Sequence, residues 1–215
     1  MAKRRKVGNL LGLAVLSALV ERPMHPYEIA SLLRERNKER DMNIKWGSLY
    51  TVVGNLEKHG FIAAVENVRD SGRPERTVYR LTPAGRAEYE DWVRDLLATP
   101  EREQPRFEAG LSVMAALGPD EVIELLVRRG DALAAEVAGM RETLSRTAEE
   151  IPRLLLAEAE YDLAMRTAEL NWVRSFVAEL TSGAMPGVEA WRHWHATGEL
   201  PDDLAELAER GSTQD

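Results

Sequence analysis

Apolar residues recur with helical spacing through the first sixty residues of the chain. The third of the helices expected there has its apolar face at positions i, i+3, i+4 and i+7, namely Leu49, Val52, Val53 and Leu56. Pro26 suits a first helical residue, and Gly60 suits the position just after a helix end. The pattern predicts helices at residues 8–20, 26–37 and 46–59.

Two short β-rich stretches follow, at residues 61–68 and 76–81, and the turn-forming segment RDSGRPE lies between them. They predict a hairpin with a basic tip. A fourth helix is expected from Pro83, with Thr82 as its N-cap. Three helices followed by a two-stranded ribbon indicate the winged form of a helix-turn-helix domain.

Beyond residue 105 the pattern is helical only, with helices expected at 106–117, 119–129, 131–150 and 152–181. The last helix is apolar on two faces, so it must be covered on two sides. One face holds Leu154, Tyr161, Met165, Trp172 and Phe176, and the other holds Leu156, Leu163, Leu170 and Val177. Its own chain can supply one cover and a second copy the other; burial inside a monomeric bundle is the alternative.

The expected fold is therefore mainly α with a small β-hairpin. Residues 1–97 are expected to form a winged helix-turn-helix DNA-binding domain, and residues 105–182 a helical dimerisation domain. Residues 183–215 form a C-terminal extension, either a small extra helix or a partly flexible segment. The residues expected at the dimer interface are Leu156, Leu163, Leu170, Trp172, Phe176 and Val177.

Charge is distributed unevenly between the two parts. Residues 1–86 contain 16 basic and 9 acidic residues, whereas the remainder contains 12 basic and 27 acidic residues. A basic module that meets a polyanion and an acidic module with another task explain this asymmetry. Random variation of surface charge is the alternative.

The third helix presents short hydrogen-bonding side chains outward, the type that reads base edges in the major groove. Lys45 precedes the helix, where its charge suits a phosphate, and Tyr50 on the flank either contacts a phosphate or closes the core against the wing. The wing arginines reach the minor groove or are merely solvated, and the segment KRRK (residues 3–6) is expected to follow DNA as a flexible arm. The expected DNA-binding residues are Lys45, Ser48, Tyr50, Thr51, Asn55, Lys58, Arg69, Arg73 and Arg76.

Catalysis, cofactors and metals are not expected. The chain has no cysteine, which excludes disulfides and thiolate chemistry. Its four histidines lack the context of a metal site, and neither a phosphate-binding glycine loop nor a nucleophile elbow is present. The apolar run at residues 10–20 is too short to span a membrane, and no signal-cleavage site follows it. A cytoplasmic protein is expected.

Several runs together resemble the PadR family of bacterial transcriptional regulators over residues 8–95: LGLAVLSALVERPMHPYEIASLL, KWGSLYTVVGNLEKHGFI and SGRPERTVYRLTPAGRAEYEDWV. The segment AELNWVRSFVAEL resembles the final dimerisation helix of the longer PadR subgroup. The resemblance implies a homodimeric winged-helix regulator, usually a repressor released by a small aromatic effector. Thr51 departs from the family pattern, in which proline commonly follows the tyrosine.

Two questions stay open at this stage. Large aromatic residues are plausible platforms for an effector, and Trp92, Tyr161 and Trp172 are the candidates, although aromatic residues at helical spacing also serve as core. A winged-helix module that binds protein instead of specific DNA is the alternative function. A dimer that reads double-stranded DNA predicts a pseudo-palindromic operator.

Overall fold

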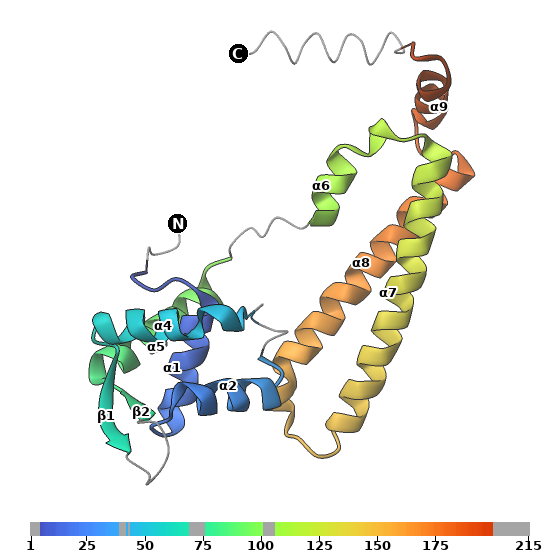
Figure 1. Cartoon of the computed structure of the whole chain (residues 1–215). Helices are drawn as coiled ribbons and strands as arrows, with labels where there is room; N and C mark the ends of the chain where they lie inside the picture. The colour runs from blue at the N-terminus through green and yellow to red at the C-terminus, as the bar shows by residue number, and fades with distance from the viewer. Residues whose placement is uncertain (1–4, 39–41, 43, 69–75, 101–105, 200–215) are drawn as a thin grey trace. The chain divides into compact units, whose positions relative to one another are not determined.

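The computed structural model describes residues 5–38, 42, 44–68, 76–100 and 106–199. The chain divides into two compact units, Met1–Glu103 and Gln104–Asp215. The described residues are mainly helical, with one two-stranded antiparallel sheet in the first unit and helices in the second (Figure 1). This confirms the expected fold class. Within the described ranges, no helix has both the length and the apolar character needed to cross a membrane.

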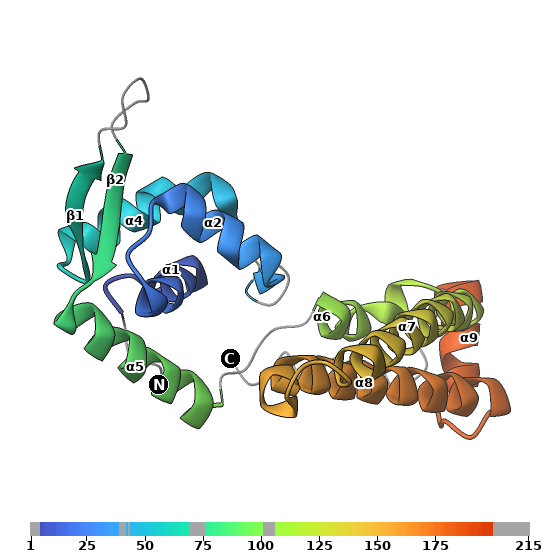
Figure 2. The same cartoon turned by 90° about the horizontal axis from the view of Figure 1, so that it is seen from below.

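The first unit is built around α1 (Leu10–Glu21), which contacts α2 (Pro26–Glu35), α4 (Leu49–Lys58) and α5 (Pro83–Ala98) (Figure 2). The side chain of Asn9 caps α1 by accepting from the Leu11 amide at 2.8 Å. His25 and Glu28 form a reciprocal capping box on α2. Because neighbours cover α1 on several sides, it is buried over most of its surface.

The hairpin is joined to the helix-turn-helix through backbone hydrogen bonds. Strand β1 (Ile62–Val68) pairs antiparallel with β2 (Arg76–Leu81), with a register shift between Ala64 and Glu66. On the other side of β2, the amides and carbonyls of Met24 and Tyr79 exchange two hydrogen bonds of 3.0 Å each. The connection between α1 and α2 therefore extends the sheet and fixes the wing to the helical core.

The junction between the hairpin and α5 is organised by Thr82 and Gly85. The Thr82 hydroxyl donates to the Gly60 carbonyl at 2.6 Å and accepts from the Gly85 amide at 3.0 Å. Gly85 lies so close to the Phe61 carbonyl that a Cβ at this position would sit 1.9 Å from its oxygen. Through these contacts, residues 82–85 (TPAG) hold the end of α4, the hairpin and the start of α5 together.

In the second unit, α7 (Pro119–Thr147) and α8 (Ala157–Ser182) form a long antiparallel helical hairpin (Figure 1). The prediction of two separate helices at 119–129 and 131–150 is wrong, because α7 runs unbroken through Gly130. A glycine inside a helix costs only about 1 kcal/mol relative to alanine. Here the apolar stripe continues on both sides of Gly130, and Val173 of α8 packs opposite it.

Short elements complete this unit: α6 (Arg106–Ser112), η2 (Met114–Ala116), η3 (Arg153–Leu156) and α9 (Val188–Thr197). Helix α9 falls in the region where the sequence left a small helix or a flexible segment open. The Trp191 indole donates to the Leu117 carbonyl at 3.0 Å, and Arg192 pairs with Asp120 at 2.7 Å. The bond from Arg192 lowers the pKa of the Asp120 carboxyl. These contacts attach α9 to the start of α7.

The two apolar faces of α8 have different surroundings. Leu156 and Leu170 are buried, and Leu163 and Val177 are partly buried against the core shared with α7. The opposite row remains exposed, with Tyr161 at 67% and Trp172 at 45% of their full accessibility. Phe176 belongs to that row but is partly buried. The described residues thus cover one face of α8 and leave Tyr161, Met165 and much of Trp172 on the other face exposed.

Candidate nucleic-acid interface

Helix α4 separates its apolar and polar residues cleanly. Leu49, Val52, Val53 and Leu56 point into the core of the first unit and are buried. Tyr50 is 67% exposed, and Thr51, Asn55 and Lys58 are exposed as well. The predicted polar face is therefore present, on a helix held rigidly by its buried side. Such a face can donate to and accept from base edges and phosphates.

The start of α4 is anchored by a short 3-10 turn, η1 (Trp46–Ser48). The Arg34 guanidinium of α2 lies 4.4 Å from the centre of the Trp46 ring, so a cation–π contact ties the two helices of the motif together. The Ser48 hydroxyl donates to the Lys45 carbonyl at 2.8 Å. Ser48 thus has a local structural role, and its oxygen retains acceptor capacity. Lys45 is exposed just ahead of the turn.

Two tyrosines near the helix-turn-helix have different environments. Tyr79 of β2 packs against the core, and its hydroxyl lies 3.4 Å from the Glu57 carboxylate. Burial, and then the nearby negative charge of Glu57, raise the pKa of Tyr79. Tyr79 is thus the residue that closes the core beside the wing. Tyr50 projects into solvent, where its hydroxyl is available to a partner.

The basic residues predicted for the wing are Arg69, Arg73 and Arg76. Arg69 and Arg73 lie outside the described residues, as does the side chain of Arg76 at the start of β2. Arg80, further along β2, is exposed and was not anticipated from the sequence. Its place next to Tyr79 in an alternating strand is the signal that would have marked it as outward-facing.

Tyr27 is a second residue that the sequence analysis missed. It lies in the first turn of α2 and is 69% exposed. Tyr50 occupies the corresponding first turn of α4. Each helix of the motif therefore begins with an exposed phenol, and a phenol hydroxyl is one of the groups that contact phosphate oxygens. The signal in the sequence is that Tyr27 falls off the apolar stripe of Ile29 and Leu33.

The expected flexible arm is wrong for Arg5. Its side chain is 4% exposed and is bound to three carboxylates of α5. The adjacent Lys6 is exposed. The sequence marks both residues simply as basic and gives no sign that an acidic surface eighty residues later holds one of them.

The three aromatic residues proposed for an effector have different environments within their own units. Trp92 is a core residue of the first unit, 5% exposed, with the Arg5 guanidinium 5.2 Å from its ring centre. Trp172 lines a hollow of about 610 Å³ in the second unit between α6, α7 and α8. Tyr161 is exposed and does not line that hollow.

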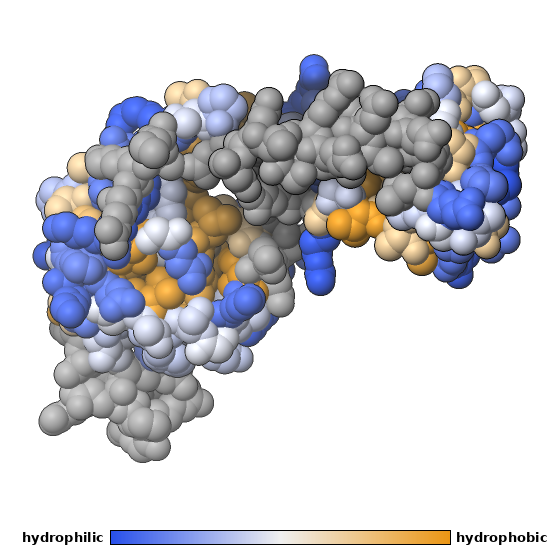
Figure 3. All heavy atoms as spheres, turned by 90° about the horizontal axis from the view of Figure 1, so that it is seen from above, coloured by the Kyte–Doolittle hydropathy of each residue, from blue (hydrophilic) through white to orange (hydrophobic). Residues whose placement is uncertain are grey.

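The hollow combines aromatic rings with arginines. Phe107 meets Trp172 edge to face at 5.9 Å between ring centres, and Trp172 stacks on Phe176 at 4.9 Å. The Arg129 guanidinium lies 3.8 Å from the centre of the Phe107 ring and pairs with Glu169. Arg106 and Arg166 also line the hollow. Figure 3 shows apolar residues reaching the surface of this unit beside hydrophilic ones. Among the residues that the structure describes, no group of three His, Asp or Glu side chains is arranged to hold a metal ion.

The first unit has the fold of a winged helix-turn-helix domain, and its α4 presents an exposed polar face. Residues 15–91 match the sequence model of the Transcriptional regulator PadR-like family. This match assigns residues 15–91, which lie within the first unit, to that family of transcriptional regulators. The resemblance inferred from the sequence is confirmed. No curated protein is similar enough in sequence to count as a match.

Solved structures share the fold at low sequence identity. Bacillus subtilis PadR in complex with operator DNA superposes with a TM-score of 0.64 at 19% identity, covering 80% of this chain and 99% of that one. The same protein in complex with p-coumaric acid gives 0.63 at 20% identity, with the same coverage. The Vibrio cholerae virulence activator AphA gives 0.58 at 19% identity, covering 80% of this chain and 98% of that one. The likeness therefore extends beyond the winged helix into the second unit.

Proposed function

We propose that the protein represses transcription as a homodimer on a pseudo-palindromic operator and is released by a small aromatic effector. The exposed polar face of α4 is the observation that carries this proposal. Tyr50, Thr51, Asn55 and Lys58 are exposed on a helix whose opposite face is fully buried. Bacillus subtilis PadR, which shares the fold, binds operator DNA.

The dimer is inferred from α8. Its uncovered row includes Tyr161, Met165 and Trp172, all exposed, and Leu154 of the preceding η3 is exposed as well. A long apolar stripe on a helix is the type of surface that a second copy covers about a two-fold axis. Such a dimer would place two copies of α4 in successive major grooves about 34–36 Å apart. The operator would then contain two related half-sites.

The hollow of the second unit supports an aromatic anion as effector. Phe107 and Trp172 offer aromatic rings. Three arginines (Arg106, Arg129 and Arg166) against two glutamates (Glu108 and Glu169) leave the lining with a net positive charge. Bacillus subtilis PadR binds p-coumaric acid, an aromatic carboxylate. An effector shifts DNA binding only by its difference in affinity for the DNA-bound and released forms.

The decisive experiment is a mobility shift with the DNA upstream of the protein's own gene, at low and moderate salt with excess competitor. A specific shift that weakens steeply with salt supports the regulator, and a reporter fused to that DNA separates repression from activation. The absence of a specific shift at both salts, followed by no enriched site in a genome-wide pull-down, favours the protein-binding module.

Tyr50→Ala is expected to weaken operator binding about 10-fold, because one exposed phosphate contact is lost at each half-site. Helix content and oligomeric state should match the wild type, since Tyr50 has no role in the core. Fluorescence anisotropy with labelled operator measures the change. Leu97→Ala, which truncates an exposed side chain on α5 of the same unit, is the matched control. Unchanged affinity in Tyr50→Ala removes the DNA-binding role assigned to this residue.

Trp172→Leu is expected to weaken binding of p-coumaric acid at least ~10-fold, because the aromatic wall of the hollow is lost while an apolar cover remains. Titration calorimetry with p-coumaric acid as the probe measures this. Tyr161→Leu changes an exposed ring on the same helix outside the hollow and should bind like the wild type. Equal affinity in both variants would place the effector elsewhere.

A further inference from the structure

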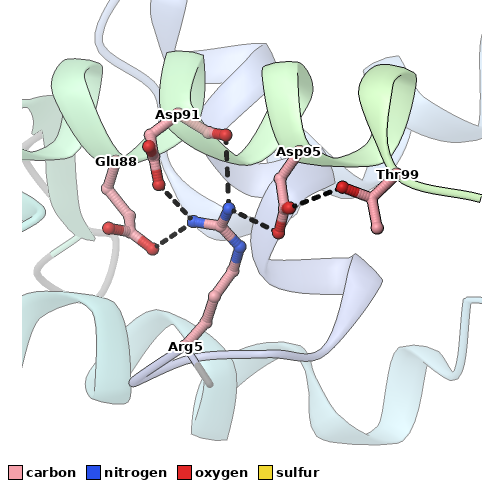
Figure 4. Close-up of polar contacts among 5 residues, drawn as sticks. All are labelled: Arg5, Glu88, Asp91, Asp95 and Thr99. Atoms are coloured by element: carbon pink, nitrogen blue, oxygen red, sulfur yellow. Dashed lines mark hydrogen bonds and ion pairs between the residues drawn. The ribbon is translucent and has the colours of Figure 1, made fainter. Parts of the chain in front are cut away.

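Arg5, near the N-terminus, is bound to helix α5 of its own chain (Figure 4). One guanidinium nitrogen of Arg5 donates to Glu88 at 2.9 Å and to Asp91 at 3.1 Å. The other donates to Asp95 at 3.2 Å and to the Asp91 carbonyl at 3.2 Å. A single planar side chain thus satisfies four acceptors on one face of α5, a geometry that lysine cannot reproduce.

The carboxylates of Glu88, Asp91 and Asp95 form a cluster, called the cradle below, whose negative charge is balanced by Arg5. Glu88, Asp91 and Asp95 fall at i, i+3 and i+7, so they share a face of α5 and would repel one another if Arg5 were absent. Burial alone would lower the pKa of Arg5, but its hydrogen bonds to the carboxylates outweigh this and leave the pKa raised. Asp95 also accepts from the Thr99 hydroxyl at 3.3 Å. The network therefore reaches from the N-terminal segment to the end of α5.

The residues next to Arg5 connect this network to the DNA-reading helix. The Arg5 guanidinium covers Trp92 of α5, and Val7 is buried in the same core as α4. Gly12 of α1 marks the meeting point, because a Cβ there would lie 2.9 Å from Val7, 3.7 Å from Val52 and 3.8 Å from Trp92. The segment, α1, α4 and α5 thus share one junction, and Val52 belongs to the buried face of α4.

We propose that residues 5–7 are a structural strap that holds α5 against the core supporting α4, and that Arg5 is a positioning residue for DNA binding. Arg5 acts on DNA through the helices it joins, without touching a phosphate itself. This inference rests on DNA binding by the winged helix and is independent of the dimer, the operator and the effector. It gives the N-terminal segment a role opposite to that of a flexible DNA-contacting arm.

Salt dependence distinguishes the two roles. A residue that contacts a phosphate releases counterions on binding, so its loss lowers the slope of log K against log salt by about 0.9. A strap residue contributes no such contact. Its loss weakens binding by the same factor at every salt concentration and also lowers the stability of the first unit.

The test compares Arg5→Ala, Arg5→Lys and Lys6→Ala in the full chain, by thermal unfolding and by anisotropy titrations with a 30-bp duplex across a range of salt. Arg5→Ala is expected to lower the unfolding midpoint of the first unit by roughly 10 °C, because three partly buried carboxylates lose their partner. It should weaken DNA binding about 10-fold with an unchanged salt slope. Lys6→Ala removes an exposed charge next to it and should leave the midpoint within ~3 °C.

Arg5→Lys keeps the positive charge, so the strap can still be tested if Arg5→Ala does not fold. The strap predicts a lower midpoint and weaker binding for Arg5→Lys, because an ammonium cannot bond to all four acceptors. A wild-type midpoint in Arg5→Ala together with a salt slope reduced by about 0.9 would overturn the strap and restore the DNA-contacting arm. Because a generic duplex and the unfolding midpoint serve as readouts, a failure to find a specific operator leaves this test intact.

A second comparison isolates the cradle. In a chain carrying Glu88→Gln, Asp91→Asn and Asp95→Asn, replacing Arg5 with methionine should lower the midpoint by much less than the same replacement in the wild type. Equal losses in the two backgrounds would show that Arg5 acts without the carboxylates and would contradict the proposal.

Discussion

Gly85→Ala is expected to destabilise the first unit by about 3 kcal/mol or more. A Cβ at Gly85 would sit 1.9 Å from the Phe61 carbonyl oxygen and 3.0 Å from a methyl group of Leu81. The first of these contacts is with backbone, and the Phe61 carbonyl is itself fixed by the Thr82 amide at 3.0 Å. The added methyl group can be accommodated only if α5 moves away from the end of α4. Overpacking that is not accommodated costs roughly 1–3 kcal/mol or more.

The sign of this effect identifies its cause. Alanine favours a helix over glycine by about 1 kcal/mol, so propensity alone predicts that Gly85→Ala stabilises α5. Gly54→Ala is the matched control, because Gly54 lies in α4 of the same unit with no atom within 4 Å of an added Cβ. Urea unfolding followed by circular dichroism should show opposite shifts for the two variants. A stabilised Gly85→Ala would contradict the close contact at Phe61.

Local features of this fold were predictable from sequence because they depend on neighbours in the chain. Pro83 and Thr82 mark the start of α5, and Gly60, with a positive φ of 73°, follows the end of α4. The hairpin follows from two β-rich stretches around a turn. The prediction that a helix ends at Gly130 is wrong, because packing against Val173 outweighs a small loss of helix propensity.

For the candidate site, too, the features set by local periodicity were predictable, and the contacts between distant parts of the chain were not. Periodicity alone places Thr51, Asn55 and Lys58 on the outward face of α4, since the apolar face of that helix is unmistakable. Periodicity cannot say what covers an apolar face. It therefore gave no means of telling that Trp92 is buried beneath Arg5 or that Leu170 faces α7, because both contacts join residues far apart in sequence.

Ending the chain near residue 105 is expected to give a monomer that binds the operator at least ~100-fold more weakly than the full chain. Joining two DNA-binding modules makes the second contact intramolecular and raises overall affinity by roughly 10²–10⁴. The first unit has its own hydrophobic core, so it should retain its helix content when separated. Analytical ultracentrifugation and anisotropy titrations measure the two changes. A truncated chain that still dimerises would contradict the role proposed for α8.

A point variant tests the same surface in the intact chain. Met165 lies in the exposed apolar row of α8, and Met165→Glu would place a charge in an interface that excludes water. The dissociation constant of the dimer should rise at least ~10-fold, which corresponds to about 1.4 kcal/mol. Asn171→Glu adds the same charge to an exposed position rotated by about 120° around the helix and should leave the dimer intact. If both variants weaken the dimer equally, repulsion in an acidic unit explains the loss. If only Met165→Glu does, the uncovered row is the surface that brings two copies of the recognition helix to one operator.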